Sequence, residues 1–287
     1  MALFKKYLIN FKAKIRSILP APAILILERI RSMPNYFCWK FDSRKGYKSF
    51  LNSTKHLKNN YNNKRCVIIG NGPSLNKIDL KLLENEYTFG LNRIYLLFNK
   101  LGFQTDFLVS INRYVIEQFH DEMSSTTCKK FYHYKYRKYI NSQDACFIPQ
   151  TIYGLNKFDK VNNGFISYSG SVTFLAIQLA IYFGFSEIIL IGFDNNFKNK
   201  GPSDKAITSK GEDSDHFHKN YFGKGVIWQL PNYDAIDFGF KIVKNYFHNT
   251  PSKTIINCTV GGNLNHFKRA ELADYLKNSK FGNKVND

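Results

Sequence analysis

Short apolar runs alternate with helical patterns along most of the chain after residue 62. The run Cys66–Ile69 ends on the glycine-rich turn Gly70-Asn71-Gly72-Pro73-Ser74, after which a helical pattern resumes. Four further runs have the length and apolarity of buried parallel strands: Tyr87–Leu91, Thr105–Ser110, Glu187–Asp194 and Thr254–Cys258. Core spacing predicts helices through Phe183, over Asp234–His248 and near Phe267–Leu276. This order predicts an α/β fold, a Rossmann-like open parallel sheet with helices on both faces.

The first 61 residues follow a different pattern. Apolar residues recur at helical spacing among lysines and arginines from Phe4 to Ile18, as in a basic amphipathic helix. We therefore expect residues 1–61 to form a helical arm with a polar linker, and residues 62–287 to form the catalytic domain. Within that domain, we expect a mobile insertion near 121–163 and a long loop near 195–225.

Charge sets the class of partner. The chain has a formal net charge of +19, and residues 1–65 contain fifteen Lys or Arg against two acids, Glu28 and Asp42. A basic amphipathic arm favours an anionic membrane surface, with packing on the domain or on a partner as the alternative. Nucleic acid is not expected, because no nucleic-acid motif follows. Pro20 and Pro22 split the apolar stretches, so no apolar run in the arm is long enough to span a membrane.

The cysteines indicate a reducing compartment. Five of them are widely spaced, without a metal-binding pattern, at positions 38, 66, 128, 146 and 258. We expect reduced cysteines, no zinc site, and a cytoplasmic protein that lies peripherally on the inner face of the membrane.

The turn after the first strand is a candidate phosphate site. Gly70 and Gly72 permit close approach of a ligand, and Ser74 is placed to cap the following helix, whose N-terminus favours anions. A turn that binds nothing fits the same pattern. Asn71, Asn92 and Asn112 each follow a predicted strand, so parallel strands would bring them to one crevice, although Asn also suits turns on its own.

A second group of candidates lies later in the chain. Ser169 and Gly170 precede a predicted helix and can hold an anion there. Asp194 ends an apolar strand, where it either faces the crevice or caps a loop. His216 and His218 are candidate general bases, because an imidazole accepts a proton near neutral pH. The pair Asp213 and Asp215 has a spacing that can bind a divalent ion, but we expect no metal.

These residues resemble a known family. The run Gly70–Leu75 followed by Ile78-Asp79, with Asn92 and Ser169-Gly170 beyond it, resembles the family-42 bacterial sialyltransferases. A wider set over residues 64–277 is similar to the domain shared by motility accessory factors and 6-hydroxymethylpterin diphosphokinase-like proteins. That set comprises Gly192-Phe193-Asp194, His216-Phe217-His218, Tyr221-Phe222-Gly223 and Thr259-Val260-Gly261-Gly262.

The sialyltransferase resemblance implies roles for the matched residues. Asn71, Gly72 and Ser74, assisted by Asn92, would hold the cytidine monophosphate part of a sugar donor. Ser169 and Gly170 would contact the carboxylate of the donor. The resemblance implies no metal and no cofactor, with the CMP-sugar as donor substrate.

The sequence departs from that family at two places. Asn195 and Asn196 stand where tyrosines steady the phosphate, and Gln229, beside Trp228, stands where the catalytic histidine is expected. Glutamine cannot act as a base. Either His216 or His218 takes the role through a shifted loop, or the chemistry differs, or catalysis has been lost.

The sequence therefore predicts a glycosyltransferase. It would move an acidic sugar from a CMP-activated donor to a polysaccharide, lipopolysaccharide, glycoprotein or lipid-linked acceptor. One alternative is pyrophosphate transfer from ATP to a pterin alcohol with magnesium, and another is an inactive nucleotide-binding subunit. A homo-oligomer is compatible with each of the three.

Overall fold

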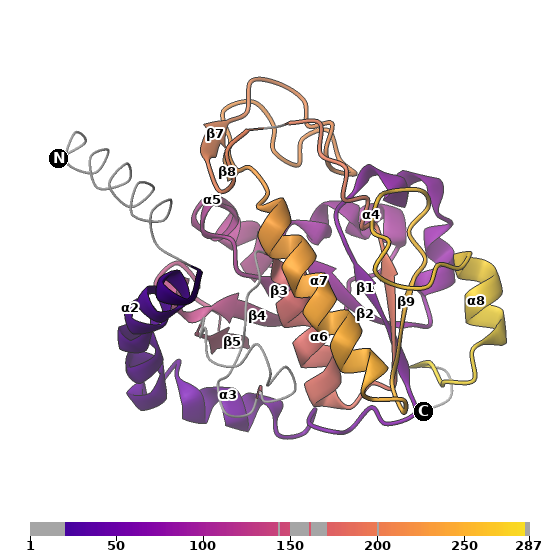
Figure 1. Ribbon diagram of the computed structural model, residues 1–287, viewed down its shortest axis with the longest axis horizontal. Coiled ribbons are helices and arrows are strands. Elements are labelled where there is room, and N and C mark those ends of the chain that lie inside the picture. The colour runs from indigo at the N-terminus through magenta and orange to yellow at the C-terminus, as the bar shows by residue number, and fades with distance from the viewer. Residues whose placement is uncertain (1–20, 143, 150–160, 162–170, 200, 285–287) are drawn as a thin grey trace.

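The protein is built around a seven-stranded parallel sheet (Figure 1). The computed structural model describes residues 21–142, 144–149, 161, 171–199 and 201–284, without the side chains of residues 21–29 and 31. The strand order is β5-β4-β3-β2-β1-β6-β9, and all six strand pairs are parallel. The bounds are β1 Arg65–Ile69, β2 Tyr87–Leu91, β3 Phe107–Ser110, β4 Lys129–His133, β5 Ala145–Ile148, β6 Glu187–Ile191 and β9 Thr254–Asn257.

Helices surround this sheet, which confirms the predicted Rossmann-like α/β fold. The α-helices are α2 Ala21–Phe41, α3 Tyr47–Thr54, α4 Phe98–Leu101, α5 Arg113–Ser124, α6 Val172–Phe183, α7 Tyr233–His248 and α8 Leu272–Asn278. Four short 3-10 helices are η1 Pro73–Lys77, η2 Leu80–Leu83, η3 Ile94–Leu97 and η4 Tyr134–Tyr136. A separate antiparallel pair, β7 Ala206–Thr208 and β8 Ile227–Gln229, lies above the sheet in Figure 1.

The core forms where α6 crosses the sheet. Every residue of α6 is buried, as is every residue of β1 and β6. Phenylalanine rings from neighbouring strands stack beneath the end of α6, with Phe89 and Phe107 at 4.4 Å and Phe107 and Phe183 at 5.2 Å between ring centroids. Offset and tilted aromatic contacts of this kind favour packing beyond simple burial. Phenylalanines therefore contribute to the packing of the strands against one another and against α6.

The strand order contains a switch point between β1 and β6. The chain runs outward from β1 to β5 and then returns to place β6 on the other side of β1. In open parallel sheets the carboxyl ends of such a strand pair diverge into a crevice. The turn after β1 and the segment after β6 meet there.

Two of the seven strands lie inside the expected irregular insertion. Residues 121–163 contain the end of α5 and the strands β4 and β5, so much of this range belongs to the sheet. The sequence pattern does not predict β4 as a strand, because Lys130 interrupts its apolar residues. In the structure the Lys130 side chain is nevertheless buried. Its ammonium donates to the carbonyl oxygens of Thr126 at 2.6 Å and Cys128 at 3.1 Å, which makes burial of the charge tolerable.

The packed domain also begins earlier than residue 62. Trp39 and Phe50 are buried in the main core, and the indole Nε1 of Trp39 donates to the carbonyl of Phe147 at 2.7 Å. Because β5 is an edge strand, this contact covers part of the exposed sheet edge. The expected basic helix from Phe4 to Ile18 lies outside the described residues.

The cysteines are all free, and four of them are core residues as expected. Burial raises the pKa of the thiols of Cys66, Cys128, Cys146 and Cys258, which makes these thiols inert. Cys38 on α2 is the exception, because its side chain is exposed. Among the described residues, no helix combines the length and the apolarity of a membrane span.

Candidate functional site

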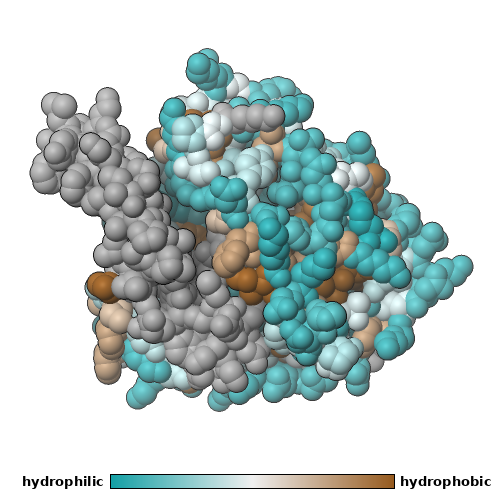
Figure 2. All heavy atoms as spheres, viewed as in Figure 1, coloured by the Kyte–Doolittle hydropathy of each residue, from teal (hydrophilic) through white to brown (hydrophobic). Residues whose placement is uncertain are grey.

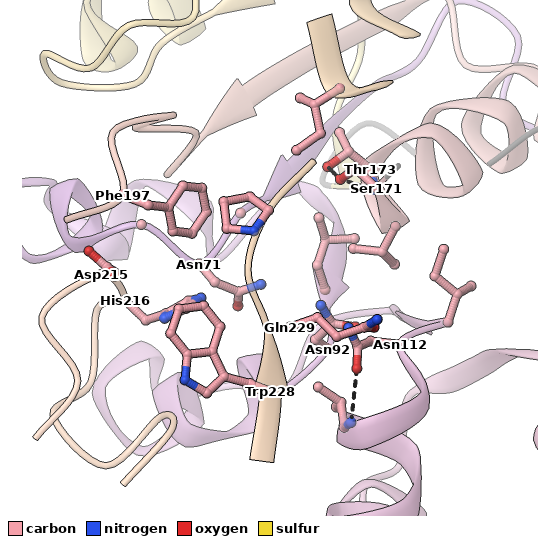
Figure 3. A pocket seen from close by; sticks show the side chains of 18 of the residues that line it. Asn71, Asn92, Asn112, Ser171, Thr173, Phe197, Asp215, His216, Trp228 and Gln229 are labelled. Atoms are coloured by element: carbon pink, nitrogen blue, oxygen red, sulfur yellow. Dashed lines mark hydrogen bonds between the residues drawn. The ribbon is translucent and has the colours of Figure 1, made fainter. Parts of the chain in front are cut away.

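A cavity of about 420 Å³ opens at the carboxyl ends of β1, β2, β3 and β6 (Figure 3). It is lined by turns after these strands, by the start of α6, by β8 and by the loop that carries His216. Of the residues predicted from the sequence as catalytic or donor-binding, seven line this cavity: Gly70, Asn71, Gly72, Asn92, Asn112, Asp194 and His216. Ser169 and Gly170 lie outside the described residues.

The three predicted asparagines do meet in this cavity (Figure 3). The side-chain oxygen of Asn92 accepts a hydrogen bond from the Ser110 hydroxyl at 3.1 Å. The side-chain oxygen of Asn112 accepts from the backbone N–H groups of Tyr114 and Val115, which caps α5. The amide NH₂ group of each is thus the polar group that remains for a ligand.

Asn71 differs from the other two. Its side-chain oxygen is buried, and no described group hydrogen-bonds to it. An unpaired buried acceptor costs free energy, so native proteins rarely retain one without a reason. A hydroxyl or amine of a bound molecule would satisfy this oxygen.

The glycine-rich turn is closed by its own hydrogen bonds. The N–H of Gly72 donates to the carbonyl of Gly192 at 2.9 Å, and Pro73 has no N–H. The carboxylate of Asp194 accepts from the Ser74 N–H at 3.1 Å and from the Ser74 hydroxyl at 2.6 Å. The N–H expected to bind phosphate is therefore already paired with a carboxylate. Ser74 and Pro73 shape the turn and do not line the cavity.

Glycine is required in this turn because β1 and β6 end very close together. A Cβ atom on Gly70 would lie 2.4 Å from the carbonyl oxygen of Gly192, and one on Gly72 would lie 1.8 Å from Asp194 Oδ2. Gly192 itself has a φ of 73°, in the left-handed region that favours glycine. These glycines therefore set the shape of the cavity floor.

The structure separates the two candidate histidines. His216 lines the cavity, whereas His218 does not. The Nδ1 atom of His216 lies 2.8 Å from Asp213 Oδ2, and the described part of the chain makes no hydrogen bond to Nε2. His218 instead uses Nδ1 to accept from the N–H of Asn220 at 3.1 Å. Of these two candidates, His216 is therefore the one whose side chain can reach a molecule in the cavity.

Asp213 is built to remain ionised beside His216. Its carboxylate also accepts from the backbone N–H groups of Asp215, at 2.8 Å, and Phe222, at 3.0 Å. Burial raises the pKa of Asp213, but the His216 hydrogen bond and these N–H donors outweigh burial and lower it overall. An ionised Asp213 holds the proton of His216 on Nδ1 and leaves Nε2 as an acceptor.

Aromatic packing fixes the plane of the His216 ring. The ring of Tyr221 lies parallel to it, with 4.1 Å between centroids and 3° between planes. Tyr221 is held in turn by buried Arg93, whose guanidinium donates to the carbonyls of Asn220 and Tyr221 and lies 3.5 Å from the Phe119 ring centroid. Sequence reasoning missed Arg93, because the two backbone carbonyls that it binds lie more than a hundred residues away in the sequence.

Asp213 and Asp215, whose spacing can bind a divalent ion, form hydrogen bonds within their own loop. Asp215 accepts from the N–H of Lys198 at 2.6 Å and from the side chain of Asn199 at 2.6 Å. Asp213 is occupied with His216. Within the described ranges, no cluster of three or more His, Cys, Asp or Glu is arranged to hold a metal.

Gln229 faces the same cavity as His216 (Figure 3). Its side-chain nitrogen donates to the carbonyl of Asp204 at 3.2 Å. The β8 strand that carries it is held on α5 by Gln118, whose amide exchanges two hydrogen bonds with the backbone of Ile227, at 2.8 and 3.0 Å. The position expected for a catalytic histidine is therefore in the wall of the cavity, with His216 supplied by a different segment.

Basic side chains stand at the side of the cavity formed by α5 and η4. Arg113 and Lys135 both line it. Arg113 pairs with Glu117 at 3.0 Å, whereas Lys135 has no carboxylate partner among the described residues. An exposed ammonium at a cavity mouth attracts anions.

The strand order and the cavity at the switch point define a Rossmann-like α/β protein. Residues 44–200, more than half of the chain, match the family model described as 6-hydroxymethylpterin diphosphokinase MptE-like, and the chain belongs to this family.

The fold is similar to that of a solved glycosyltransferase. The MAf glycosyltransferase from Magnetospirillum magneticum AMB-1 matches with a TM-score of 0.51 and 15% sequence identity. The match covers 84% of this chain but 40% of that one, so the present chain spans less than half of its length. No curated protein matches the chain.

Proposed function

We propose that this protein is a glycosyltransferase that moves an acidic sugar from a CMP-activated donor to a polysaccharide, lipopolysaccharide, glycoprotein or lipid-linked acceptor. The observation that carries the proposal is the position of His216, which lines the amide-rich cavity with Asp213 behind it. The similarity in fold to a glycosyltransferase supports the reaction class.

The transfer uses His216 as the general base. Its Nε2 takes the proton of an acceptor hydroxyl while that oxygen bonds to the anomeric carbon and the bond from this carbon to the phosphate of the donor breaks. Asp213 stabilises the imidazolium that forms. The leaving CMP already bears charge, so hydrogen bonds from the asparagine amides and the charge of Lys135 stabilise it without a metal.

The donor would lie along the carboxyl ends of β1, β2 and β3. The NH₂ groups of Asn92 and Asn112 offer donors to its nucleotide, and the unpaired oxygen of Asn71 accepts from an amine or hydroxyl. The basic amphipathic arm expected within residues 1–61 would hold the enzyme on the inner face of the cytoplasmic membrane.

Pyrophosphate transfer from ATP to a pterin alcohol is the second candidate, because the description of the family favours it. Calorimetric titration with CMP, CDP, UDP, GDP and ATP, each with and without magnesium, separates the two. Selective binding of CMP without metal supports the glycosyltransferase, and hydrolysis of a CMP-sugar establishes catalysis. Preference for ATP with magnesium favours the second candidate. Binding without turnover of any donor identifies an inactive nucleotide-binding subunit.

A further inference from the structure

Helix α2 has an inner face that joins it to the domain. Trp39 is completely buried, and Tyr36 packs beside it with 6.1 Å between ring centroids. These two residues lie one helical turn apart, on the side of α2 that faces β5 and α3. The orientation of α2 on the domain is set by this face.

The opposite face of α2 is apolar, and no other described part of the chain covers it. Ile30, Pro34, Phe37 and Phe41 follow a spacing of four, three and four residues, which places them in one line along a helix. The exposed fractions are 56% for Ile30, 53% for Phe37 and 80% for Phe41. We call these four residues the apolar seam. Figure 2 shows hydrophobic side chains at the left edge of the molecule, where α2 lies.

The segment around the seam is strongly basic. Six cations occur between residues 29 and 48, namely Arg29, Arg31, Lys40, Arg44, Lys45 and Lys48. The acid in that interval, Asp42, is occupied internally: it accepts from the N–H groups of Arg44 and Lys45 and from the Tyr134 hydroxyl. Burial raises the pKa of Asp42, but these hydrogen bonds and Arg137 lower it overall.

We propose that the apolar seam docks on an anionic lipid surface. An apolar helix face flanked by lysines and arginines gains from burial at the boundary of lipid headgroups and acyl chains and from attraction to anionic headgroups. A partner without negative charge would leave the net positive charge of this segment uncompensated. The charge of this segment therefore favours an anionic leaflet over a second, equally basic copy of the chain.

Hydrogen bonds connect the segment that carries the seam to one wall of the cavity. The Asp42 carboxylate binds the hydroxyl of Tyr134 at 2.9 Å, and the Lys45 ammonium donates to the carbonyls of Arg137 and Ile140 at 3.0 and 2.8 Å. Tyr134 begins η4, whose next residue, Lys135, lines the cavity. Docking of α2 would thus hold this wall of the cavity beside the leaflet and favour a lipid-linked acceptor. This last step rests on the proposed function, whereas docking itself does not.

Cys38 provides a reporter for the docking step. It is the exposed cysteine among five, and it follows Phe37 directly on α2. The full chain labelled there with an environment-sensitive fluorophore is mixed with vesicles of phosphatidylglycerol and phosphatidylcholine in equal parts, or of phosphatidylcholine alone. A blue shift with the anionic vesicles that weakens at high salt is expected. An unchanged spectrum with both vesicles overturns the proposal.

Vesicle flotation of the unlabelled chain tests the seam itself. The double variant Phe37→Ser/Phe41→Ser should lower partitioning onto the anionic vesicles by about 10- to 100-fold, because two exposed rings no longer enter the interface. The matched control is Phe238→Ser, which removes a ring of 49% exposure from α7 and should leave partitioning unchanged.

Two results contradict the proposal. If the double variant and the wild type partition equally, other parts of the chain bind the vesicles. If the wild type is a dimer and the double variant is a monomer, the seam is an interface between two copies of the chain. Thermal unfolding verifies that the variants fold. Since flotation involves no sugar donor, failure of docking and failure of the transferase assignment are distinguished.

Discussion

The backbone N–H of Phe217 donates a hydrogen bond to the backbone carbonyl of Asn71 at 2.9 Å. The carbonyl of Phe217 in turn accepts from the side chain of Asn76 at 2.8 Å. The backbone N–H and the backbone carbonyl of Phe217 are therefore both hydrogen-bonded to residues that follow β1. The position of His216, the preceding residue, is thereby set relative to Asn71, although the two lie far apart in the sequence.

Replacement of His216 should abolish most of the activity. We expect His216→Ala to lower turnover of a CMP-sugar by roughly 100- to 10,000-fold, because the acceptor hydroxyl loses its base. Affinity for CMP should change little, since His216 acts on the acceptor. Steady-state transfer and calorimetric titration measure the two quantities.

The matched control is His218→Ala. This side chain accepts a backbone N–H outside the cavity, so its loss should leave turnover nearly unchanged. Equal losses in both variants, or no loss in either, would remove His216 from the mechanism.

Substitution of Asp213 should change both activity and the response to acid. We expect Asp213→Asn to lower turnover by roughly 10- to 1,000-fold, because the proton of His216 is no longer held on Nδ1. The folded pKa of Asp213 is lowered, so its ionised form stabilises the fold above the unfolded pKa near 4. That stabilisation is lost as the pH falls below about 4 through the folded pKa.

Thermal unfolding of the two proteins across that range tests the sign. The wild type should lose more stability than the Asp213→Asn variant as the pH falls below about 4. Parallel curves would show that the carboxylate has the same pKa in the folded and unfolded chains.

Alanine substitutions at Asn71 and Ser74 should affect different properties, although the two residues lie three positions apart. The first should lower the affinity for CMP, and the second should lower the stability of the fold. Asn71→Ala removes an oxygen that has no described partner, so stability should change by less than about 0.5 kcal/mol while the affinity for CMP falls by about 1 to 3 kcal/mol. Ser74→Ala breaks the 2.6 Å bond to Asp194 and should cost about 1 to 3 kcal/mol of stability. A large loss of stability in Asn71→Ala would show that its oxygen has a structural partner.

Gly70 tests the close contact of β1 and β6. Gly70→Ala would place a Cβ atom 2.4 Å from the backbone oxygen of Gly192, which cannot move as a side chain can. We expect a loss of about 1 to 3 kcal/mol in the free energy of unfolding, measured by denaturant titration. Gly211→Ala is the control, because a Cβ atom there meets nothing within 4 Å, and it should be neutral.

The sequence predicts the sheet and the meeting of its asparagines for one physical reason. Parallel strands carry their carboxyl ends to the same edge, so residues that follow such strands come together whatever the loops between them do. Asn71, Asn92 and Asn112 are examples. The prediction needs the strand assignments and no knowledge of the loops.

Long-range pairings within loops are where sequence reasoning falls short. The bond between Ser74 and Asp194 spans 120 residues, and it converts an expected phosphate site into a carboxylate-capped turn. The choice of His216 over His218 likewise depends on how one loop folds. Local pattern carries no information on these partners. Lys130 obscures the strand β4 for a different reason, because its charge is satisfied by the backbone carbonyls of the nearby residues Thr126 and Cys128.

The hydrogen bond from Gly72 to Gly192 also bears on chemical ageing. An Asn-Gly dipeptide deamidates when the glycine nitrogen attacks the asparagine side chain and forms a succinimide. Here the N–H of Gly72 donates a hydrogen bond to the carbonyl of Gly192 at 2.9 Å. Close contacts around Gly72 also prevent the backbone rotation that the attack requires. The folded protein thus protects the Asn71 amide, whereas each unfolded molecule exposes it to conversion into a negatively charged carboxylate at the floor of the cavity.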